Sequence, residues 1–430
     1  MKRLLSVILA AALILSAAAF PAGAVTDYDE WVQSWEETRS SDGYILLTPG
    51  ADKTQMNFSW QSPFFSKKGE IIIGKAADLS DGTSLKVKRS LCAIGMEWTN
   101  EATATELSDS TTYYYKYITD GAESEIYSFT TDSNGKTKAV FFTDSQIGRW
   151  RGSEDDEEIY LHDTYGWNTT LETVFENNKD IDFILSSGDQ VEDSYSEEQY
   201  SLFESPEILR SVPVAASVGN HDFYTTNFSR HFNTPNDKTF VPFRWPGSNG
   251  YFFCYNDVLF IILDSNNFIP ASFNAVLRKA TKTYPDAKWR VAMMHHSPYD
   301  ANAHKYFTSK ITRKTIAPSF DKFGIDLVLS GHDHYYSRSF IIKDNKVTDD
   351  KAVNNVYTNP NGTLYISGNT SSGCNFSGID EEDVGDCCDV YVQNRIPTYS
   401  IVDFNGGRLT VSTYEVEGNK LIDEVAVVKD

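Results

Sequence analysis

Side chains that can bind metal ions follow the apolar runs in the second part of this sequence, at the point where each run ends. The endings are Asp144 with Gln146, Gly188-Asp189, Gly219-Asn220-His221-Asp222, His295-His296-Ser297-Pro298 and Gly331-His332-Asp333-His334. Carboxylates, amide oxygens and imidazoles in one site suit Mn²⁺, Zn²⁺ or Fe²⁺. One such ending alone is more often a helix cap or a turn. Their repetition along one stretch of chain predicts a metal site.

Histidines and glycines concentrate at the same endings. The chain has 8 histidines, and the endings contain His221, His295, His296, His332 and His334. Glycine precedes the polar residues at Gly188, Gly219 and Gly331. We expect these glycines to let the backbone turn sharply as it leaves a strand.

The apolar runs predict the strands that position these side chains. The expected strands are residues 139–142, 183–187, 212–218, 258–263, 291–294, 327–329 and 364–366. Helical stretches lie between them, including residues 171–178, 197–209 and 273–284. Continuous apolar strands that alternate with helices are typical of an α/β domain whose sheet is covered on both faces. Ligands of such domains bind beyond the carboxyl ends of the strands, where the polar endings would meet.

An all-β domain is expected in front of the α/β domain. Short strands recur at residues 44–47, 55–60, 70–74, 85–87, 91–98, 112–118 and 126–130. Turn residues such as Pro49-Gly50 and Asp120-Gly121 separate them. This spacing predicts an immunoglobulin-like sandwich over residues 40–132. A linker at residues 132–135 would join it to the second domain, residues 136–415.

The N-terminus resembles a secretory signal peptide. Lys2 and Arg3 precede an apolar run that ends near Phe20, and Ala22-Gly23-Ala24 follows. This order predicts a signal peptide at residues 1–24 and a secreted protein, with an uncleaved membrane anchor as the alternative. No other stretch reaches the roughly 18 consecutive apolar residues of a membrane-spanning helix. The chain after cleavage is therefore expected to be soluble.

The net charge bears on which partners the protein binds, and the cysteines bear on whether it forms disulfides. A formal net charge of −22 disfavours a role as a nucleic-acid scaffold. Because an exported chain can form disulfides, Cys374 is a candidate partner for Cys387 or Cys388. Cys92 and Cys254 lie in strand-like runs, where we expect buried free thiols.

The order of the five endings resembles the calcineurin-like metallophosphoesterase superfamily. The whole chain is similar to its purple-acid-phosphatase-like branch, in which a fibronectin-III-like sandwich precedes the metal domain. Further similarity lies at Leu47-Thr48-Pro49-Gly50, at Trp60, and at residues 362–369 and 397–402. The resemblance implies a four-layer fold with two β-sheets flanked by helices. It also implies two divalent or trivalent ions of Fe, Mn or Zn.

The resemblance assigns ligands ending by ending. Asp144 and His334 would hold the first metal, and Asp189 would bridge both metals. Asn220, His295 and His332 would hold the second. His295 is preferred because the strand that ends at residue 294 delivers it first, and His296 remains the alternative.

Two positions depart from the family pattern. Purple acid phosphatases carry a tyrosine three residues after the bridging aspartate, where this chain has Glu192. Other superfamily members have histidine where this chain has Gln146. Gln146 would ligate through its amide oxygen, or Glu192 would take the vacant position, or both would only support the ligands.

The same residues suit the hydrolysis of a small phosphorylated substrate. Two cations offset the charge of the phosphate and activate a water for in-line attack. We expect His221 to protonate the leaving alkoxide and Asp222 either to orient His221 or to cap the backbone. His304 would contact phosphate or lie on a surface loop. The alternatives are a phosphodiesterase acting on nucleotide, lipid or cell-wall diesters, and a cell-surface binding module with a decayed metal site.

Overall fold

The computed structural model describes residues 27–38, 44–92, 97–131, 135–241, 250–302, 307–349 and 352–430. The expected signal peptide, residues 1–24, and His304 lie outside these residues. Among the helices described, none is both long and apolar enough to cross a membrane.

The first domain is the expected β-sandwich. One sheet has the order β1 (Ile45–Pro49), β2 (Met56–Pro63), β6 (Glu97–Ala104) and β5 (Lys88–Cys92). The other has the order β4 (Thr83–Ser84), β3 (Glu70–Gly74), β7 (Thr112–Thr119) and β8 (Ala122–Glu123), with β9 (Tyr127–Thr130) also paired to β7. The two sheets enclose a core that includes Phe58, Trp60, Ile71 and Tyr115.

The strand bounds predicted from the sequence are wrong in the middle of the sandwich. Residues 85–87 form no strand, and the expected strand 91–98 is two antiparallel strands, β5 and β6, in which Cys92 pairs with Glu97. The prediction of one strand over this run is therefore wrong. An apolar run that contains the end of one strand and the start of another has the same composition as a continuous strand, so the pattern does not separate them.

The second domain has two seven-stranded sheets. The first has the order β12 (Val214–Ala216), β11 (Phe183–Ser186), β10 (Thr137–Phe142), β23 (Thr398–Asn405), β24 (Arg408–Glu415), β25 (Lys420–Val428) and β20 (Val356–Thr358). The second has the order β13 (Tyr251–Tyr255), β14 (Val258–Ile262), β15 (Trp289–His296), β16 (Leu327–Gly331), β21 (Leu364–Ser367), β17 (Tyr336–Ser339) and β22 (Cys388–Val392). A small separate sheet pairs β18 (Ile341–Lys343) with β19 (Lys346–Asp349).

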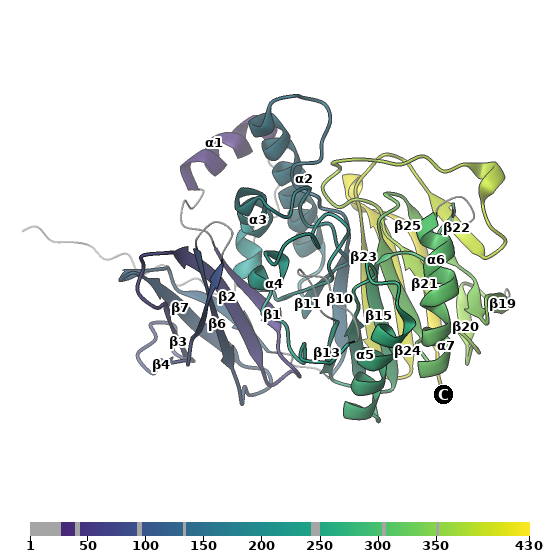
Figure 1. Ribbon diagram of the computed structural model, residues 1–430, viewed down its shortest axis with the longest axis horizontal. Coiled ribbons are helices and arrows are strands. Elements are labelled where there is room, and N and C mark those ends of the chain that lie inside the picture. The colour runs from purple at the N-terminus through teal and green to yellow at the C-terminus, as the bar shows by residue number, and fades with distance from the viewer. Residues whose placement is uncertain are drawn as a thin grey trace, which may run out of the picture.

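Helices cover the outer faces of both sheets, as Figure 1 shows. The core between the sheets includes Phe141, Leu185, Phe260 and Leu329. Helices α2 (Asp156–Asn177) and α3 (Glu197–Glu204) pack on the first sheet. The second sheet is covered by α5 (Pro270–Thr283), α6 (Phe307–Thr315) and α7 (Ala317–Phe323). The expected four layers, with a sandwich in front, are confirmed.

Helix α2 is much longer than the expected stretch 171–178. Asp155 caps it, because its carboxylate accepts a hydrogen bond from the Glu157 N–H at 3.0 Å, and the acidic first turn suits the positive end of the helix dipole. Its first half buries polar residues such as Asp163 and Thr164. The apolar periodicity that would have predicted this half is therefore missing. The N-terminal helix α1 (Tyr28–Thr38) packs on α2 through aromatic contacts of Tyr28 and Trp31 with Tyr165.

Three C-terminal strands were not expected. β23 pairs antiparallel with β10 at the centre of the first sheet, and β24 and β25 extend that sheet. β25 lies beyond residue 415, so the sheet continues past the expected end of the domain. β24 and β25 mix buried with partly or fully exposed residues, unlike the continuously buried parallel strands.

Hydrogen bonds join the sandwich directly to the second domain. The amide nitrogen of Asn233, just after α4 (Phe228–His231), donates hydrogen bonds to the carbonyls of Phe58 at 3.2 Å and Ala102 at 3.0 Å. The Tyr115 hydroxyl donates to the carbonyl of Arg210 at 2.7 Å. These contacts fix the sandwich against the segments that follow β11 and β12.

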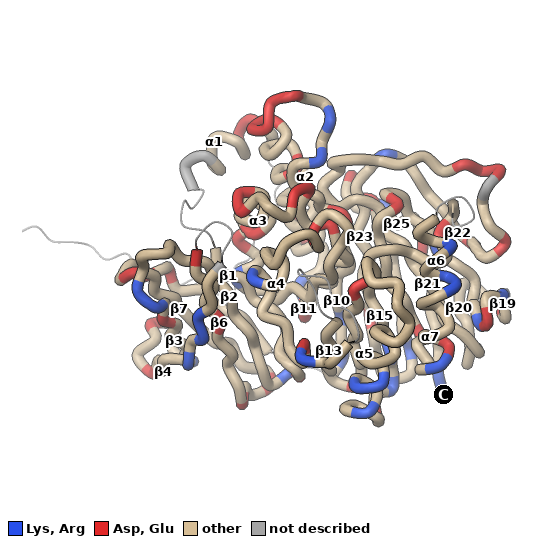
Figure 2. The backbone as a smooth tube through the Cα atoms, in the orientation of Figure 1, with Lys and Arg blue, Asp and Glu red and all other residues tan. Residues whose placement is uncertain are grey.

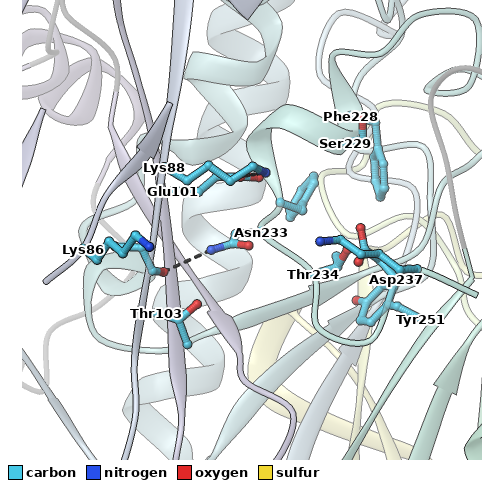
Figure 3. A pocket seen from close by; sticks show the side chains of 13 residues that line it. Lys86, Lys88, Glu101, Thr103, Phe228, Ser229, Asn233, Thr234, Asp237 and Tyr251 are labelled. Atoms are coloured by element: carbon cyan, nitrogen blue, oxygen red, sulfur yellow. Dashed lines mark hydrogen bonds and ion pairs between the residues drawn. The ribbon is translucent and has the colours of Figure 1, made fainter. Parts of the chain in front are cut away.

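An open cavity of about 430 Å³ lies at this boundary. Figure 3 shows Lys86, Lys88 and Thr103 on the sandwich side, facing Phe228 and Tyr251. Asn233 bridges the two sides by the bond to Ala102. No residue of the five polar endings lines this cavity. It is a feature of the domain boundary.

A buried ion cluster lies beside the same boundary. The two ring nitrogens of His231 contact Glu204 at 2.7 Å and Glu197 at 2.9 Å, and the ring stacks on Tyr200 with centroids 4.3 Å apart. Burial alone would favour the neutral ring. The two carboxylates more than offset burial and raise the pKa of His231 to about 10.

We therefore expect the variant His231→Phe to keep the stacking on Tyr200 but to lose about 3–5 kcal/mol of unfolding free energy near pH 6, because two carboxylates are left without their cation. The folded pKa lies above the unfolded value of 6.5. The stabilisation is thus complete below about pH 6.5 and is lost as the pH rises through about 10. Denaturant unfolding from pH 6 to 10 measures this difference between wild type and variant.

The control variant is His162→Phe. The His162 side chain is 35% exposed, contacts Asp163 at 2.9 Å and stacks on Trp150. This variant should lose less than about 1 kcal/mol. A constant difference between wild type and His231→Phe at every pH would show that the charge of His231 does not stabilise the fold.

Candidate metal centre

The loops after β10 and β11 run side by side and carry the first of the predicted ligands. The N–H of Asp144 donates to the carbonyl of Gly188 at 3.2 Å, and the N–H of Gln146 donates to the carbonyl of Asp189 at 2.8 Å. Asp144, Gln146 and Asp189 have positive φ angles of 50°, 36° and 50°. Non-glycine residues rarely adopt this conformation, and it is concentrated at functional sites. His332 and His334 share it, with φ angles of 76° and 52°.

Two of the glycines are required for different reasons. Gly188 has a φ of +103°, and a Cβ there would lie 2.6 Å from Nδ1 of His295. Gly331 has no positive φ, but a Cβ there would lie 1.7 Å from Oγ1 of Thr143 and 2.5 Å from Oδ2 of Asp144. The expected sharp turn is therefore found at Gly188, whereas Gly331 provides space for Thr143 and Asp144.

Asp144 and His334 form the first group. Nε2 of His334 lies 3.3 Å from Oδ1 of Asp144, and Nδ1 of His334 donates to the carbonyl of Asn375 at 3.1 Å. The other carboxylate oxygen of Asp144 accepts hydrogen bonds from the Thr143 hydroxyl and from the N–H of His332, the latter at 2.9 Å. Both side chains are thus held with a free ligand atom facing the other.

Asp189, Asn220, His295 and His332 form the second group. Nδ1 of His295 donates to the carbonyl of Ser187 at 2.9 Å, which leaves Nε2 available as a ligand atom. Nε2 lies 3.1 Å from Oδ2 of Asp189, 3.0 Å from Oδ1 of Asn220 and 3.3 Å from Nδ1 of His332. If one ligand atom is taken from each of Asp189, His295 and His332, the three atoms lie within 4.8 Å of one another. Lone pairs that converge in this way fit a cation.

The electrostatics of the centre fit a cation too. Burial disfavours the charged form of His295, but Asp189 and Asp144 more than offset burial and raise the pKa of His295 to about 9. Burial and the charge of His295 lower the pKa of His332 to about 4. In the metal-free protein, a proton on His295 supplies the positive charge that the carboxylates require. A metal ion would replace that proton.

Among the predicted metal ligands, two buried acceptor atoms lack hydrogen bonds. They are Oδ1 of Asp144 and Oε1 of Gln146. Buried polar atoms are almost always hydrogen-bonded, so an exception in a ring of ligand side chains points to a ligand that they bind. The residues therefore fit the expected metal ions.

The alternative ligand His296 lies beside the rings of His295 and His332. It is the last residue of β15, buried, and its Nδ1 lies 2.8 Å from the hydroxyl of Ser265. Its ring centroid is 4.5 Å from that of His332. It is not among the residues whose ligand atoms converge on Asp189.

Asp222 does not contact the ring of His221. Its Oδ2 accepts hydrogen bonds from the N–H of Asp189 at 2.7 Å and of Gly219 at 2.8 Å. The expectation that Asp222 orients His221 is therefore wrong, and the alternative, a backbone cap, is what the structure shows. Nδ1 of His221 instead lies 2.9 Å from the carbonyl of Glu192.

Three residues beside the candidate metal centre were not predicted from the sequence. Arg149 and Arg151 both contact Glu192, at 3.0 and 2.6 Å. Thr143 binds Asp144 and approaches Gly331. Two arginines placed two residues apart, directly after the first ending, were the available signal for a partner carboxylate.

The predicted disulfide is wrong. Cys374, Cys387 and Cys388 are free thiols, as is Cys254. Sγ of Cys374 faces the hydroxyl of Thr370 at 3.4 Å, next to the backbone of Asp144, whereas Cys388 lies in β22. Cys254 is only partly buried, and the side chain of Cys92 lies outside the described residues.

Two family comparisons match the two domains. Residues 138–336 match the calcineurin-like phosphoesterase family, and residues 44–131 match the purple acid phosphatase N-terminal domain. The chain thus carries a calcineurin-like phosphoesterase domain behind a purple acid phosphatase N-terminal domain. The phosphoesterase match spans β10 to the start of β17, which includes every predicted metal ligand.

The curated relatives are phosphatases with low identity to this chain. Acid phosphatase type 7 of Mus musculus is 26% identical over 217 residues, which is 45% of this chain and 48% of the relative. Purple acid phosphatase 5 of Arabidopsis thaliana is 24% identical over 229 residues, which is 51% of this chain and 52% of the relative. The chain spans about half the length of the curated relatives it matches.

Solved structures share the fold. Purple acid phosphatase PPD1 from yellow lupin (Lupinus luteus) seeds superimposes with a TM-score of 0.69 and 16% identity, over 90% of this chain and 74% of that chain. PhoD superimposes with a TM-score of 0.58 and 9% identity, over 89% of this chain and 92% of that chain. The phosphoesterase domain and the sandwich are therefore arranged as in known structures.

Proposed function

We propose that this chain is a secreted phosphatase that hydrolyses phosphate monoesters at a centre of two metal ions. The observation that carries the proposal is the convergence of two groups of ligand side chains, one around Asp144 and one around Asp189, at the carboxyl ends of strands from both sheets. Relatives that resemble it in sequence are named acid phosphatases. The charged and then apolar N-terminal run up to Phe20 supports secretion.

The residues of the centre have distinct tasks in this reaction. When bound, two cations supply Lewis-acid charge and lower the pKa of water. Asp189 would be shared between the two ions, and Asp144 would hold one of them. Asn220 and His332 would bind as neutral ligands, which would leave the net positive charge of the centre available to the oxygens of the phosphate.

His221 is the proposed proton donor. Its backbone N–H donates a hydrogen bond to Oδ1 of Asp189 at 2.9 Å. The ring atom Nδ1 lies 2.9 Å from the carbonyl oxygen of Glu192. Nε2 is then the ring atom left to protonate the departing alkoxide, and the side chain is 29% exposed, so that substrate can reach it.

Removal of the metals tests the proposal. We expect the purified protein to contain about two Mn, Zn or Fe ions, and a chelator should reduce hydrolysis of an aryl phosphate by at least about 10³-fold, since a metal-free site loses both the charge and the activated water. Adding back one metal at a time identifies the ion that restores activity.

The substrate panel needs matched monoesters and diesters of one alcohol. Faster hydrolysis of monoesters supports the proposal, whereas faster hydrolysis of diesters would make the chain a phosphodiesterase. Metal binding without hydrolysis of any ester would instead favour a binding module. Full activity after complete removal of metal would contradict the two-metal centre itself.

A further inference from the structure

The carboxylate of Glu192 lies at the meeting point of four side chains beside the metal centre. Oε1 accepts hydrogen bonds from Arg149 at 3.0 Å and Arg151 at 2.6 Å. Oε2 accepts one from the amide nitrogen of Gln146 at 2.9 Å and lies 3.3 Å from Nδ1 of His221. The side chain is 18% exposed. Both oxygens of Glu192 are therefore already engaged.

The bond from Gln146 determines which atom of that amide faces away from Glu192. Because Nε2 donates to Glu192, the amide oxygen points to the other side, and Oε1 is buried without a hydrogen bond. The backbone of Gln146 is anchored on Asp189 by the bond to its carbonyl at 2.8 Å. An amide oxygen held in this way, two residues after Asp144 in the chain, is a preorganised ligand atom.

Glu192 itself is poorly placed to bind a metal. A metal bound by Glu192 would compete with the two arginines for Oε1, or with Gln146 for Oε2. Figure 2 shows that the chain before α2 carries basic and acidic residues in close succession, and Glu192 is the acidic partner of both Arg149 and Arg151. Charge-assisted bonds of this kind are about twice as strong as neutral ones, so the carboxylate stays with the arginines.

We propose that Glu192 is a positioning residue that fixes the Gln146 amide with its oxygen toward the metal bound by Asp144 and His334. This inference rests on the proposed two-metal function. It assigns Gln146 as a ligand and Glu192 as the residue that orients it. The same carboxylate, through its contact with Nδ1 of His221, connects the two sides of the centre.

Only a carboxylate meets the requirement at position 192. Its neighbours Arg149, Arg151 and Gln146 all present N–H groups, so both oxygens must accept. Glutamine has the same shape but one N–H₂ group. If its oxygen faces the arginines, its nitrogen faces the nitrogen of Gln146, and the Gln146 amide then turns its own nitrogen toward the metal.

Metal titration of the full-length metal-free protein tests the inference. Mn²⁺ binding is measured by calorimetry for wild type, Glu192→Gln, Gln146→Ala and the double variant. We expect Glu192→Gln to weaken one of the two binding steps by about 10–100-fold, the usual effect of removing a residue that orients a ligand. Gln146→Ala should weaken the same step. The double variant should be no weaker than Gln146→Ala, because Glu192 acts through Gln146.

The control is Glu198→Gln, which removes an exposed glutamate in the first turn of α3 and should leave both steps unchanged. General damage to the fold would weaken both steps, not one. If Glu192→Gln does not fold, Glu192→Asp replaces it, because the shorter carboxylate leaves the Gln146 amide without its partner.

Three outcomes would overturn the inference. Wild-type affinity in Glu192→Gln would mean that Gln146 needs no orientation. Additive losses in the double variant would mean that Glu192 binds the metal independently of Gln146. A wild-type protein that binds no Mn²⁺, Zn²⁺ or Fe²⁺ would overturn the proposed function as well, and that result is separate from the first two.

Discussion

Replacing Asp189 with alanine should remove activity almost completely. Asp189 is buried, with Oδ2 at 3.1 Å from Nε2 of His295 and Oδ1 bound to the N–H of His221 at 2.9 Å. It is the carboxylate proposed to be shared by both metals. Loss of one preorganised charge-stabilising donor already costs about 10²–10³-fold in kcat. We expect the loss of the shared ligand to lower kcat/KM by at least about 10³-fold.

Metal content and activity are measured together on the same Asp189→Ala preparation. The matched control is Asp193→Ala, an exposed aspartate in the same loop that accepts a bond only from the N–H of Tyr195 among its described side-chain contacts. It should retain wild-type metal content and rate. Circular dichroism shows whether both variants are folded. If Asp189→Ala kept its metals and its rate, Asp189 would not be the bridging ligand.

The meeting of the ligands could be predicted from the sequence because parallel strands end at a common edge. β10, β11 and β12 are parallel, as are β14, β15, β16 and β21. Residue types that follow such strands are placed together by the fold, with no knowledge of side-chain detail. The roles of Asp144, Asp189 and His332 as metal ligands remain predictions.

The partners of the supporting residues could not be predicted. Gln146 and Glu192 are 46 positions apart, and Asp222 and the N–H of Asp189 are 33 apart. Such contacts depend on how the loops fold over the strand ends, which composition and periodicity do not contain. The disulfide prediction was wrong for the same reason, because spacing along the chain does not give the distance between sulfur atoms.

The weak periodicity of some elements hid them. β24 and β25 extend the first sheet with exposed positions among the buried ones, and the first half of α2 buries polar groups against its neighbours. Both patterns are compatible with loops in the sequence. Tertiary contacts, not local preference, determine these elements.

Replacing His221 with alanine should separate proton transfer from metal binding. Its contact with Asp189 is made by the backbone N–H, which alanine retains. Metal content should therefore stay close to that of the wild type. Only the imidazole is lost, and with it the proposed proton donor.

We expect kcat of His221→Ala to fall by roughly 10²–10⁴-fold for an alkyl phosphate, the usual contribution of a general acid. An aryl phosphate with an acidic phenol departs without protonation, so its rate should fall much less. The measurement is kcat for a series of esters with alcohols of increasing acidity, at constant metal loading. A steeper dependence on the leaving group in the variant identifies His221 as the donor. Equal losses across the series would mean that His221 positions the phosphate, because an interaction with the phosphate oxygens does not depend on which alcohol departs.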